Sequence, residues 1–471
     1  MEKYIIENVE IVDIGHDGKA IGKSGGLVIF ADNAVPGDFI DVEIYKKKKT
    51  FSLGKNVNLR TPSPHRREAF CSHFGLCGGC KWQHFDYAEQ LNFKYKQVVD
   101  AFERIAKIPI PEILPVLPSV NTKYYRNRLD YSGSNKKWVK DLRSIPHGEL
   151  SGGGLGFHLP GWFDKVIDIE KCYLQPEPTN AIRNAVREFA LANNYSFFDL
   201  NAQTGWLRGL IIRTTSTNET MVILIVGFED IEKVSKLYDH IIPQFKEVTS
   251  WMYVMNTKKN DTVSDLDMRL YKGREFLVEE MSSYTNPDKV IRYIIGPKSF
   301  FQTNTSQASV LFRTAADFAN LHGDELVYDL YTGAGAIANY IANSAERVVG
   351  LEYVEAAVND ARKNSDLNQI KNTSFFAGDM KDLLNDAFIA KEGKPDVIIT
   401  DPPRAGMHED VVKKMMEISC PKIVYVSCNP ASLARDCAMM ADSYEITAIQ
   451  PIDMFPHTSH IETVVLLEKK S

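Results

Sequence analysis

The sequence lacks the features of a membrane protein or a secreted protein. It contains no run of about 20 consecutive apolar residues, so we expect no membrane-spanning helix. Its N-terminal residues include early acidic side chains and no apolar signal core, which predicts a cytoplasmic location. The composition, 44% hydrophobic and 25% charged, is typical of globular proteins, and a length of 471 residues predicts more than one domain.

The chain also lacks a basic excess and an even number of cysteines. It has 55 Lys and Arg against 61 Asp and Glu, a net charge of −6. This charge argues weakly against non-specific nucleic-acid binding but leaves room for local basic patches. Seven cysteines in a cytoplasmic chain argue against a disulfide framework. Cys71, Cys77 and Cys80 lie within ten residues, a crowding typical of metal or cluster ligation.

Three regions of different pattern follow one another along the chain. Residues 1–62 predict a small β-barrel of the OB type, with a turn at Gly22–Gly26. Residues 63–295 read as mainly β, with a helix over 87–105 whose apolar positions recur at helical spacing. Residues 296–471 alternate strand and helix, which predicts an α/β domain with a parallel sheet and helices on both faces. The strands expected there are 326–330, 347–351, 373–377, 397–400, 422–427 and 463–467.

The first strand of the third region runs into a glycine turn. Tyr331 opens this turn, and Gly333 and Gly335 allow the backbone to approach a ligand above the strand ends. About twenty residues later the next strand is followed by Glu352, which can accept hydrogen bonds from two ribose hydroxyls. Asp379, after the third strand, is placed to reach an adenine edge. The turn lacks the third glycine of a NAD-type fingerprint, so by itself it indicates only a doubly wound α/β domain.

Two later strands are followed by residues that can carry chemistry. Two prolines fix the backbone after Asp401 and direct Asp401 and Arg404 into the crevice at the strand ends. Arg404 stands where amine methyltransferases carry an aromatic residue, which argues against amine methylation. Cys428 follows the next strand; a free cysteine is most often a small core residue, but residues just after such strands are more often functional. Glu462 lies in a polar loop before the last strand.

Together these residues fit methylation of carbon 5 of uracil. That carbon is too weak a nucleophile to take a methyl group directly, but a thiolate that adds to carbon 6 creates an enolate whose carbon 5 is nucleophilic. A base must then remove the carbon 5 proton so that the thiolate can leave. Cys428 fits the nucleophile, Glu462 the base, and Asp401 with Arg404 the polar groups on the pyrimidine edge.

These motifs resemble the RNA 5-methyluridine methyltransferase family, specifically its 23S ribosomal RNA branch, over essentially the whole chain. The resemblance implies a TRAM domain at 1–62, a central domain at 63–295 and a Rossmann-like catalytic domain at 296–471. It implies S-adenosyl-L-methionine as methyl donor, with Gln302, Tyr331, Glu352 and Asp401 binding the donor or beside it. It also implies Cys428 as the nucleophile and Glu462 as the base.

Four cysteines, Cys71, Cys77, Cys80 and Cys172, are enough for a zinc ion or a [4Fe–4S] cluster. Composition alone favours zinc, whereas the resemblance implies the cluster. The spacing C-x5-C-x2-C differs from that of radical S-adenosylmethionine enzymes. Since the reaction needs no electron, we expect the cluster to staple the central domain and to shape an RNA surface.

Two segments interleave cations with aromatic residues, as RNA-binding surfaces do. They are Lys123–Arg128 and Lys136–Lys140, and an equally good interpretation of each is a solvated strand with one buried aromatic. The expected partner is RNA, as a 23S ribosomal hairpin or loop, and we expect neither DNA nor a membrane. We expect the chain to act as a monomer.

Three alternatives to a ribosomal uridine remain at this point. A transfer RNA uridine is one. A cytosine is the second, although cytosine-5 enzymes carry a Pro-Cys pair before the nucleophile motif, whereas this chain has Cys420-Pro421 in reverse order and elsewhere. The third is a non-catalytic RNA-binding or assembly factor that carries the cluster; it would not need Cys428.

Overall fold

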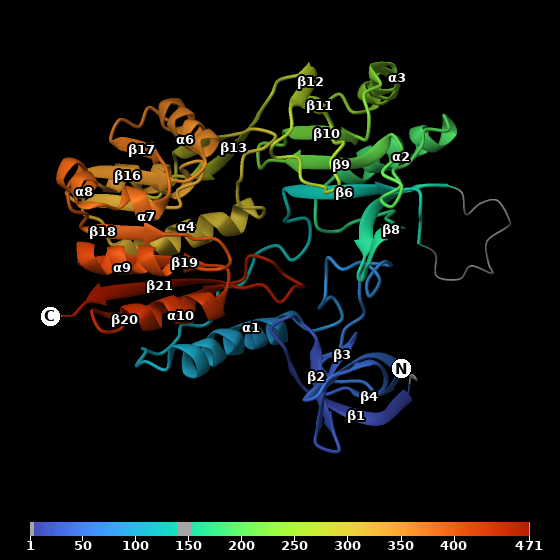
Figure 1. Cartoon of the computed structure of the whole chain (residues 1–471), viewed down its shortest axis with the longest axis horizontal. Helices are drawn as coiled ribbons and strands as arrows, with labels where there is room; N and C mark the ends of the chain where they lie inside the picture. Colours follow the sequence, from blue (N-terminus) through green and yellow to red (C-terminus); the bar gives the residue numbers. More distant parts are fainter. Residues whose placement is uncertain (1–3, 139–151, 471) are drawn as a thin grey trace.

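The computed structural model describes residues 4–138 and 152–470. Three parts are visible: a barrel at the N-terminus, a sheet of the central region and an α/β unit that ends at the C-terminus (Figure 1). Residues 139 and 140, the end of the second basic–aromatic segment, lie outside the described residues. In the described ranges no helix is both long and apolar enough to cross a membrane.

The N-terminal barrel closes in the strand order β1-β2-β3-β5-β4 around a core of valine and isoleucine side chains. Its strands are β1 (Tyr4–Ile14), β2 (Ala20–Ser24), β3 (Leu27–Asp32), β4 (Phe39–Lys47) and β5 (Phe51–Thr61). The turn predicted at Gly22–Gly26 is wrong in its first half, because Gly22 lies inside β2. A Cβ atom at Gly22 would lie 2.6 Å from Val9 Cγ1 of β1, so the glycine permits a close strand crossing.

The central region forms a seven-stranded sheet in the order β12-β11-β10-β9-β6-β7-β8. Two helices, α2 (Thr179–Ala192) and α3 (Ile231–Ile241), pack against it and share its hydrophobic core. The strands are β6 (Arg128–Ser134), β7 (Gly154–Leu159), β8 (Trp162–Asp168), β9 (Leu207–Thr214), β10 (Thr220–Val226), β11 (Ser250–Met255) and β12 (Met268–Gly273).

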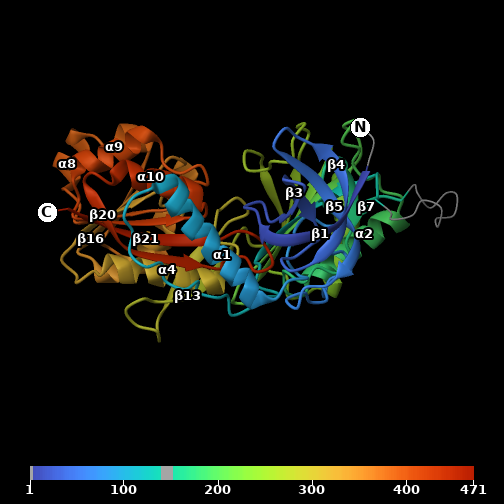
Figure 2. The ribbon, with the colours of Figure 1, turned by 90° about the horizontal axis from the view of Figure 1, so that it is seen from below.

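The helix predicted over 87–105 is present as α1 (Tyr87–Ala101), followed by a π-helical turn, Phe102–Ala106. It runs from the barrel along the α/β unit (Figures 1 and 2). Val98 and Phe102 pack into the core of that unit, as predicted for an apolar face. Its buried face also carries three polar residues, Gln90, Lys94 and Gln97.

The C-terminal sheet has the strand order β17-β16-β15-β18-β19-β21-β20 and confirms the predicted α/β, Rossmann-like fold class. β15 to β19 are parallel, but β21 runs antiparallel to β19 and to β20. The prediction of a wholly parallel sheet was therefore wrong in detail, and β20 was not predicted.

The bounds of the elements in this unit are as follows. The strands are β15 (Leu326–Leu330), β16 (Arg347–Glu352), β17 (Thr373–Ala377), β18 (Val397–Thr400), β19 (Lys422–Ser427), β20 (Tyr444–Ile452) and β21 (Glu462–Lys469). The helices are α4 (Thr305–Ala319), α5 (Ala336–Ile341), α6 (Glu355–Leu367), α7 (Met380–Leu383), α8 (Asp386–Glu392), α9 (Glu409–Ile418) and α10 (Pro430–Met440).

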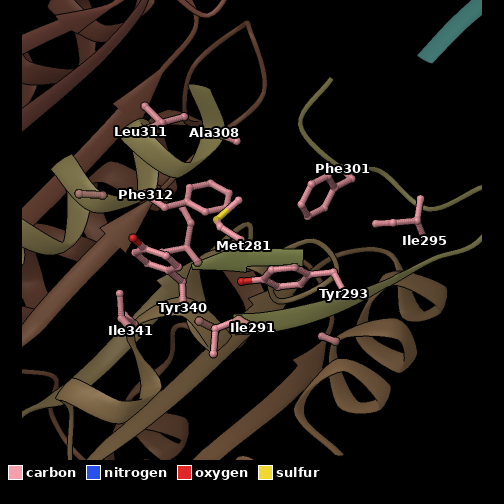
Figure 3. Close-up of a cluster of buried hydrophobic side chains, with 14 of the residues drawn as sticks. Met281, Ile291, Tyr293, Ile295, Phe301, Ala308, Leu311, Phe312, Tyr340 and Ile341 are labelled. Atoms are coloured by element: carbon pink, nitrogen blue, oxygen red, sulfur yellow. The ribbon is translucent and has the colours of Figure 1, made fainter. Parts of the chain in front are cut away.

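A two-stranded ribbon, β13 (Leu277–Ser282) and β14 (Val290–Ile295), docks on the α/β unit. Figure 3 shows its apolar side chains against those of α4 and α5. Tyr293 of this ribbon packs on Phe301 with ring centroids 5.3 Å apart and donates a hydrogen bond to the Ala336 carbonyl at 3.0 Å. Phe301 is thereby fixed in the core, and its neighbours Phe300 and Gln302 reach the cavity described next.

Candidate active site

A cavity of about 1060 Å³ opens at the carboxyl edge of the C-terminal sheet. The carboxyl ends of parallel strands meet at one edge, which is where ligands bind in such sheets. β21 runs antiparallel, so its first residue, Glu462, lies at the same edge. Ser427 of β19 pairs with Thr463 of β21. Cys428, which follows Ser427, and Glu462, which precedes Thr463, are therefore neighbours at the ends of these two strands. Both line the cavity together with Asp401 and Arg404.

Burial and nearby carboxyl groups keep the Cys428 thiol protonated in the resting protein. Burial first, and then the carboxyls of Glu462 and Asp401, raise the pKa of Cys428 to about 11, while Arg404 opposes them. Glu462 is buried, which raises its pKa well above the usual range, and Asp401 adds to this effect. Burial, and then Asp329, raise the pKa of Asp401 to about 7. These carboxyl groups can bind a cationic ligand when they are ionised, and a bound cation would in turn favour their ionised forms.

The loop that carries Asp401 and Arg404 is held by the helix that follows Cys428. Asn429 Nδ2 and Ser432 Oγ donate to the Arg404 carbonyl at 3.0 and 3.2 Å. The buried Asp436 carboxylate accepts from the Met407 amide at 2.9 Å. The first turns of α10 therefore fix the position of the Asp401 loop relative to the thiol.

The donor side of the cavity is formed by the turn after β15 and the end of β16. Tyr331, Gly333, Glu352 and Gln302 all line the cavity. Glu352 accepts from the Gly333 amide at 3.1 Å and from the Val354 amide at 2.9 Å, which leaves lone pairs on both oxygens for further donors. Gly333 has φ +55°, and a Cβ atom there would meet nothing within 4 Å, so the backbone is open to a ligand.

Two predicted donor-binding residues are not among those that line this cavity. Asp379 caps the short helix α7 by accepting from the Lys381 amide at 3.2 Å, and its charge contributes to the raised pKa of Tyr331. Gly335 has φ +73°, and a Cβ atom there would lie 2.8 Å from Asn339 Nδ2. The contact of Asp379 with adenine stays a prediction. A glycine at position 335 is explained by its backbone conformation and by the lack of room for a Cβ atom.

All four predicted cluster ligands line a second cavity, of about 530 Å³. Cys71, Cys77 and Cys80 come from one loop, and Cys172 follows β8. Burial raises the pKa of Cys80 to about 12 and that of Cys172 to about 11. Within residues 4–138 and 152–470, no three His, Cys, Asp or Glu side chains are grouped so that they could hold a metal ion. The two cavities share Gly78, Arg126 and Phe300 as wall residues.

The two basic–aromatic segments differ in the structure. In the first, Arg126 lines both cavities and Lys123 Nζ lies 4.0 Å from the ring centroid of Phe70. In the second, Lys136 and Lys137 form ion pairs with Asp164 and Asp168 of β8 at 3.0 and 2.8 Å. The second segment therefore has a structural role for its described lysines, whereas the first borders the cavities.

The sequence analysis missed a buried clamp on the loop before Glu462. Lys94 Nζ of α1 lies 2.5 Å from Asp453 Oδ1, and both side chains are fully buried. Tyr87 donates to the other oxygen of Asp453 at 2.8 Å, and Gln90 Oε1 accepts from the His457 amide at 3.0 Å. The polar residues Gln90, Lys94 and Gln97 of α1 could have indicated the clamp. The apolar residues at helical spacing indicated only an ordinary amphipathic helix. The clamp fixes the loop before Glu462 to a helix more than 350 positions earlier in the chain.

Comparison with known proteins supplies the family. Residues 266–470 match the family model described as tRNA (Uracil-5-)-methyltransferase. A protein of Bacteroides thetaiotaomicron, described as an uncharacterized RNA methyltransferase, is 49% identical over 458 residues, which are 96% of this chain and 99% of that protein. The chain belongs to the RNA uracil-5-methyltransferase family. A Porphyromonas gingivalis protein with the same description is 48% identical over 98% of this chain and 100% of its own.

A solved structure agrees with this family over the whole fold. The Pyrococcus abyssi tRNA (uracil-54, C5)-methyltransferase, in complex with S-adenosyl-L-homocysteine, has a TM-score of 0.76 and 29% sequence identity, and the match covers 98% of this chain and 100% of that one. The predicted enzyme class, an RNA methyltransferase dependent on S-adenosylmethionine, is confirmed. The RNA that it modifies and the roles of individual residues are taken up below.

Glu352 offers a test of the donor side. Glu352→Ala is expected to weaken binding of S-adenosylmethionine by about 1.5–3 kcal/mol, the scale for hydrogen bonds to a charged group. RNA affinity should barely change. Isothermal calorimetry measures the loss, with Glu355→Ala as the matched control, because Glu355 is an exposed carboxylate three residues away on α6. Equal donor affinity in the Glu352 and Glu355 variants would exclude Glu352 as the ribose ligand.

Proposed function

We propose that this enzyme forms 5-methyluridine in 23S ribosomal RNA, with Cys428 as nucleophile and Glu462 as base. The observation that carries the proposal is the register of β19 and β21, which brings the thiol and the carboxyl to one cavity together with Asp401. A thiol and a base in one cavity are what carbon 5 methylation through a covalent adduct requires.

The donor fits the cavity in charge and in wall chemistry. S-adenosylmethionine supplies an electrophilic methyl group on a sulfonium, and its positive charge favours the ionised forms of Cys428 and Glu462. Glu352 holds the ribose, and Tyr331 and Gln302 enclose the donor from the sides. Once the donor is bound, its positive charge offsets the surroundings that keep the Cys428 thiol protonated in the resting protein, and the thiolate can form.

The reaction then proceeds on the uracil ring. The Cys428 thiolate forms a bond to carbon 6, and the electron pair of the 5,6 double bond moves onto carbon 5 and the carbon 4 oxygen. Arg404 and Asp401 bind the pyrimidine edge, where this charge develops. Carbon 5 takes the methyl group as the methyl–sulfur bond of the donor breaks and S-adenosyl-L-homocysteine leaves. Glu462 then removes the carbon 5 proton, and the 5,6 double bond reforms as the thiolate leaves.

A transfer RNA uridine is the second candidate substrate. It is favoured by the Pyrococcus abyssi enzyme, which acts on uracil-54 of tRNA. Ribosomal RNA is favoured by the resemblance to the branch with a TRAM domain and four cysteines. Mapping 5-methyluridine in both RNAs, from cells with and without this protein, distinguishes them. Loss of a 23S site supports the proposal, and loss confined to transfer RNA contradicts it.

We also propose that Cys71, Cys77, Cys80 and Cys172 hold a [4Fe–4S] cluster. Four thiols around one cavity fit such a cluster in number and chemistry. Four thiols could also hold a zinc ion, and the resemblance to the branch with four cysteines is what favours the cluster. The cluster would join the Cys71–Cys80 loop to the end of β8 and would take no part in methyl transfer. Cytoplasmic location and a monomeric state stay predictions.

The cluster has a direct spectroscopic consequence. Protein purified without oxygen is expected to be brown, with broad absorption near about 400 nm and roughly four irons per chain. Cys172→Ala should lose the colour as fully as Cys77→Ala, whereas Cys437→Ala, which removes a buried thiol of α10, should keep it. Colourless protein with stoichiometric zinc would refute the cluster, and a full cluster in Cys172→Ala would remove that residue from the ligand set.

A further inference from the structure

The hairpin between β7 and β8 presents two large aromatic side chains to solvent. Trp162 is 53% exposed and Phe163 is 69% exposed. Such rings usually bury most of their area, because each contributes strongly to the hydrophobic core. Neither ring has a part in donor binding or in the chemistry at Cys428, so their exposure calls for another explanation.

The turn of this hairpin has a defined backbone conformation. Its turn is Pro160-Gly161, where proline fixes its own backbone and Gly161 has φ +82°, as a tight turn requires. Leu159 pairs with Trp162 across the turn. At the root of the hairpin, Phe157 stacks on Tyr131 of β6 with ring centroids 5.0 Å apart. The register of β7 and β8 shifts between His158 and Leu159, so the residues that follow Trp162 bulge away from the ladder.

The tip of the hairpin lies beside both cavities. A Cβ atom added at Gly78 would lie 3.0 Å from Pro160 Cγ, so Pro160 and Gly78 are in contact range. Gly78 lines the active-site cavity and the cysteine cavity. Phe157 and His158 of β7 also line the cysteine cavity. The hairpin is thus part of the rim that an RNA meets on its way to Cys428.

Cations accompany the aromatic rings on this rim. Lys165 Nζ lies 4.0 Å from the ring centroid of Trp162. Lys171 Nζ lies 5.0 Å from the ring centroid of Tyr173, and both residues line the cysteine cavity. An ammonium group beside the exposed ring of Trp162 matches an unpaired nucleotide, which offers a phosphate and a base face together.

We propose that Trp162 and Phe163 form a stacking site for an unpaired base of the RNA substrate, outside the catalytic pocket. The site rests on the proposed function in that the ligand is the RNA that carries the target uridine. The target base must leave its stack to reach Cys428, and the strand around it is open at that moment. Stacking of a neighbouring base on the hairpin holds the strand in that open form.

Trp162 supplies its own probe. Of five tryptophans, Trp82, Trp206 and Trp251 are at most 2% exposed and Trp138 is half-buried, so Trp162 is the most accessible. Single-stranded oligoadenylate of about 12 nucleotides is expected to quench the intrinsic fluorescence more strongly than an RNA duplex of equal length, because only unpaired bases expose their faces. Trp162→Phe should lose this quenching while it keeps the affinity.

Removal of the rings should weaken RNA binding without affecting the donor. Trp162→Ala is expected to raise the Kd for unmodified 23S transcripts on the order of tenfold, and Trp162→Ala together with Phe163→Ala more than that. In turnover the loss should fall on KM for RNA, while donor affinity and Tm stay unchanged. Phe228→Ala is the matched control, because Phe228 is also exposed (41%) beneath a lysine, Lys233, but lines neither cavity.

Unchanged RNA affinity in the double variant, or an equal loss in Phe228→Ala, would overturn the stacking site. Quenching of Trp162 by phosphatidylserine vesicles but not by RNA would assign the rings to a membrane surface instead. If oligoadenylate quenches Trp162 and the double variant binds RNA weakly, yet the native enzyme forms no 5-methyluridine, the proposed function fails and the stacking site stands.

Discussion

Cys428→Ala is expected to abolish methyl transfer, with a loss of activity on the order of 10⁴-fold or more, the scale seen when a catalytic nucleophile is removed. The thiolate starts the reaction, and no other group in the cavity can make carbon 5 nucleophilic. Transfer of a labelled methyl group to unmodified 23S RNA measures the loss. Donor affinity should be retained, because Glu352, the proposed ribose ligand, lines the same cavity and is left intact.

A cysteine of α10 provides the control for this prediction. Cys437 is fully buried and is absent from the cavity lining, so Cys437→Ala removes a thiol of equal size from the core of the helix that follows Cys428. It should lower stability and leave the activity of the folded enzyme intact. If Cys428→Ala and Cys437→Ala have the same modest effect, Cys428 is a packing residue and the covalent scheme is wrong.

Glu462→Gln is expected to trap the methylated adduct as a covalent protein–RNA complex. Glu462 acts after methyl transfer, and without it the carbon 5 proton stays in place and the thiolate cannot leave. Glutamine has the shape of the protonated acid, which is the resting form that burial and the raised pKa of Glu462 favour, so the fold should be kept. A denaturing gel should show a complex that requires both the donor and Cys428.

Glu468→Gln is the matched control for the base, since Glu468 lies on the same strand, β21, away from the cavity. It should turn over normally and leave no complex. His460 also lines the cavity, and burial, together with cationic neighbours, Arg404 first, lowers its pKa to about 4, so its imidazole is neutral and able to accept a proton. Normal turnover of Glu462→Gln would transfer the base role to His460 or to a water molecule.

The α/β unit could be predicted closely because its strands are short, apolar and followed by distinctive residues. Buried parallel strands read as continuous apolar runs, and the position after each strand is set by the topology alone. β20 was missed because it interrupts the alternation of strand and helix: it pairs antiparallel with β21 and its exposed and buried residues alternate. A search for parallel strands does not find this pattern.

Contacts between distant segments could not be predicted from the sequence. Lys94 reads as a solvated lysine of an amphipathic helix, because nothing local shows that Asp453 will be buried against it. Gly22 reads as a turn residue, because the strand that crosses it, β1, is not specified by neighbouring residues. The exposure of Trp162 could not be predicted either, since an aromatic residue beside a turn is as typical of a core strand as of a recognition hairpin.

RNA with 5-fluorouridine at the target position tests the covalent mechanism most directly. Fluorine cannot be removed as a proton, so methyl transfer to carbon 5 leaves the ring bound to the enzyme. With S-adenosylmethionine and the unmodified enzyme, we predict a stable complex in which mass spectrometry finds the fluorinated, methylated nucleotide on Cys428. A complex through another residue, or no complex with an RNA that the enzyme methylates when it carries uridine, would contradict Cys428 as the nucleophile.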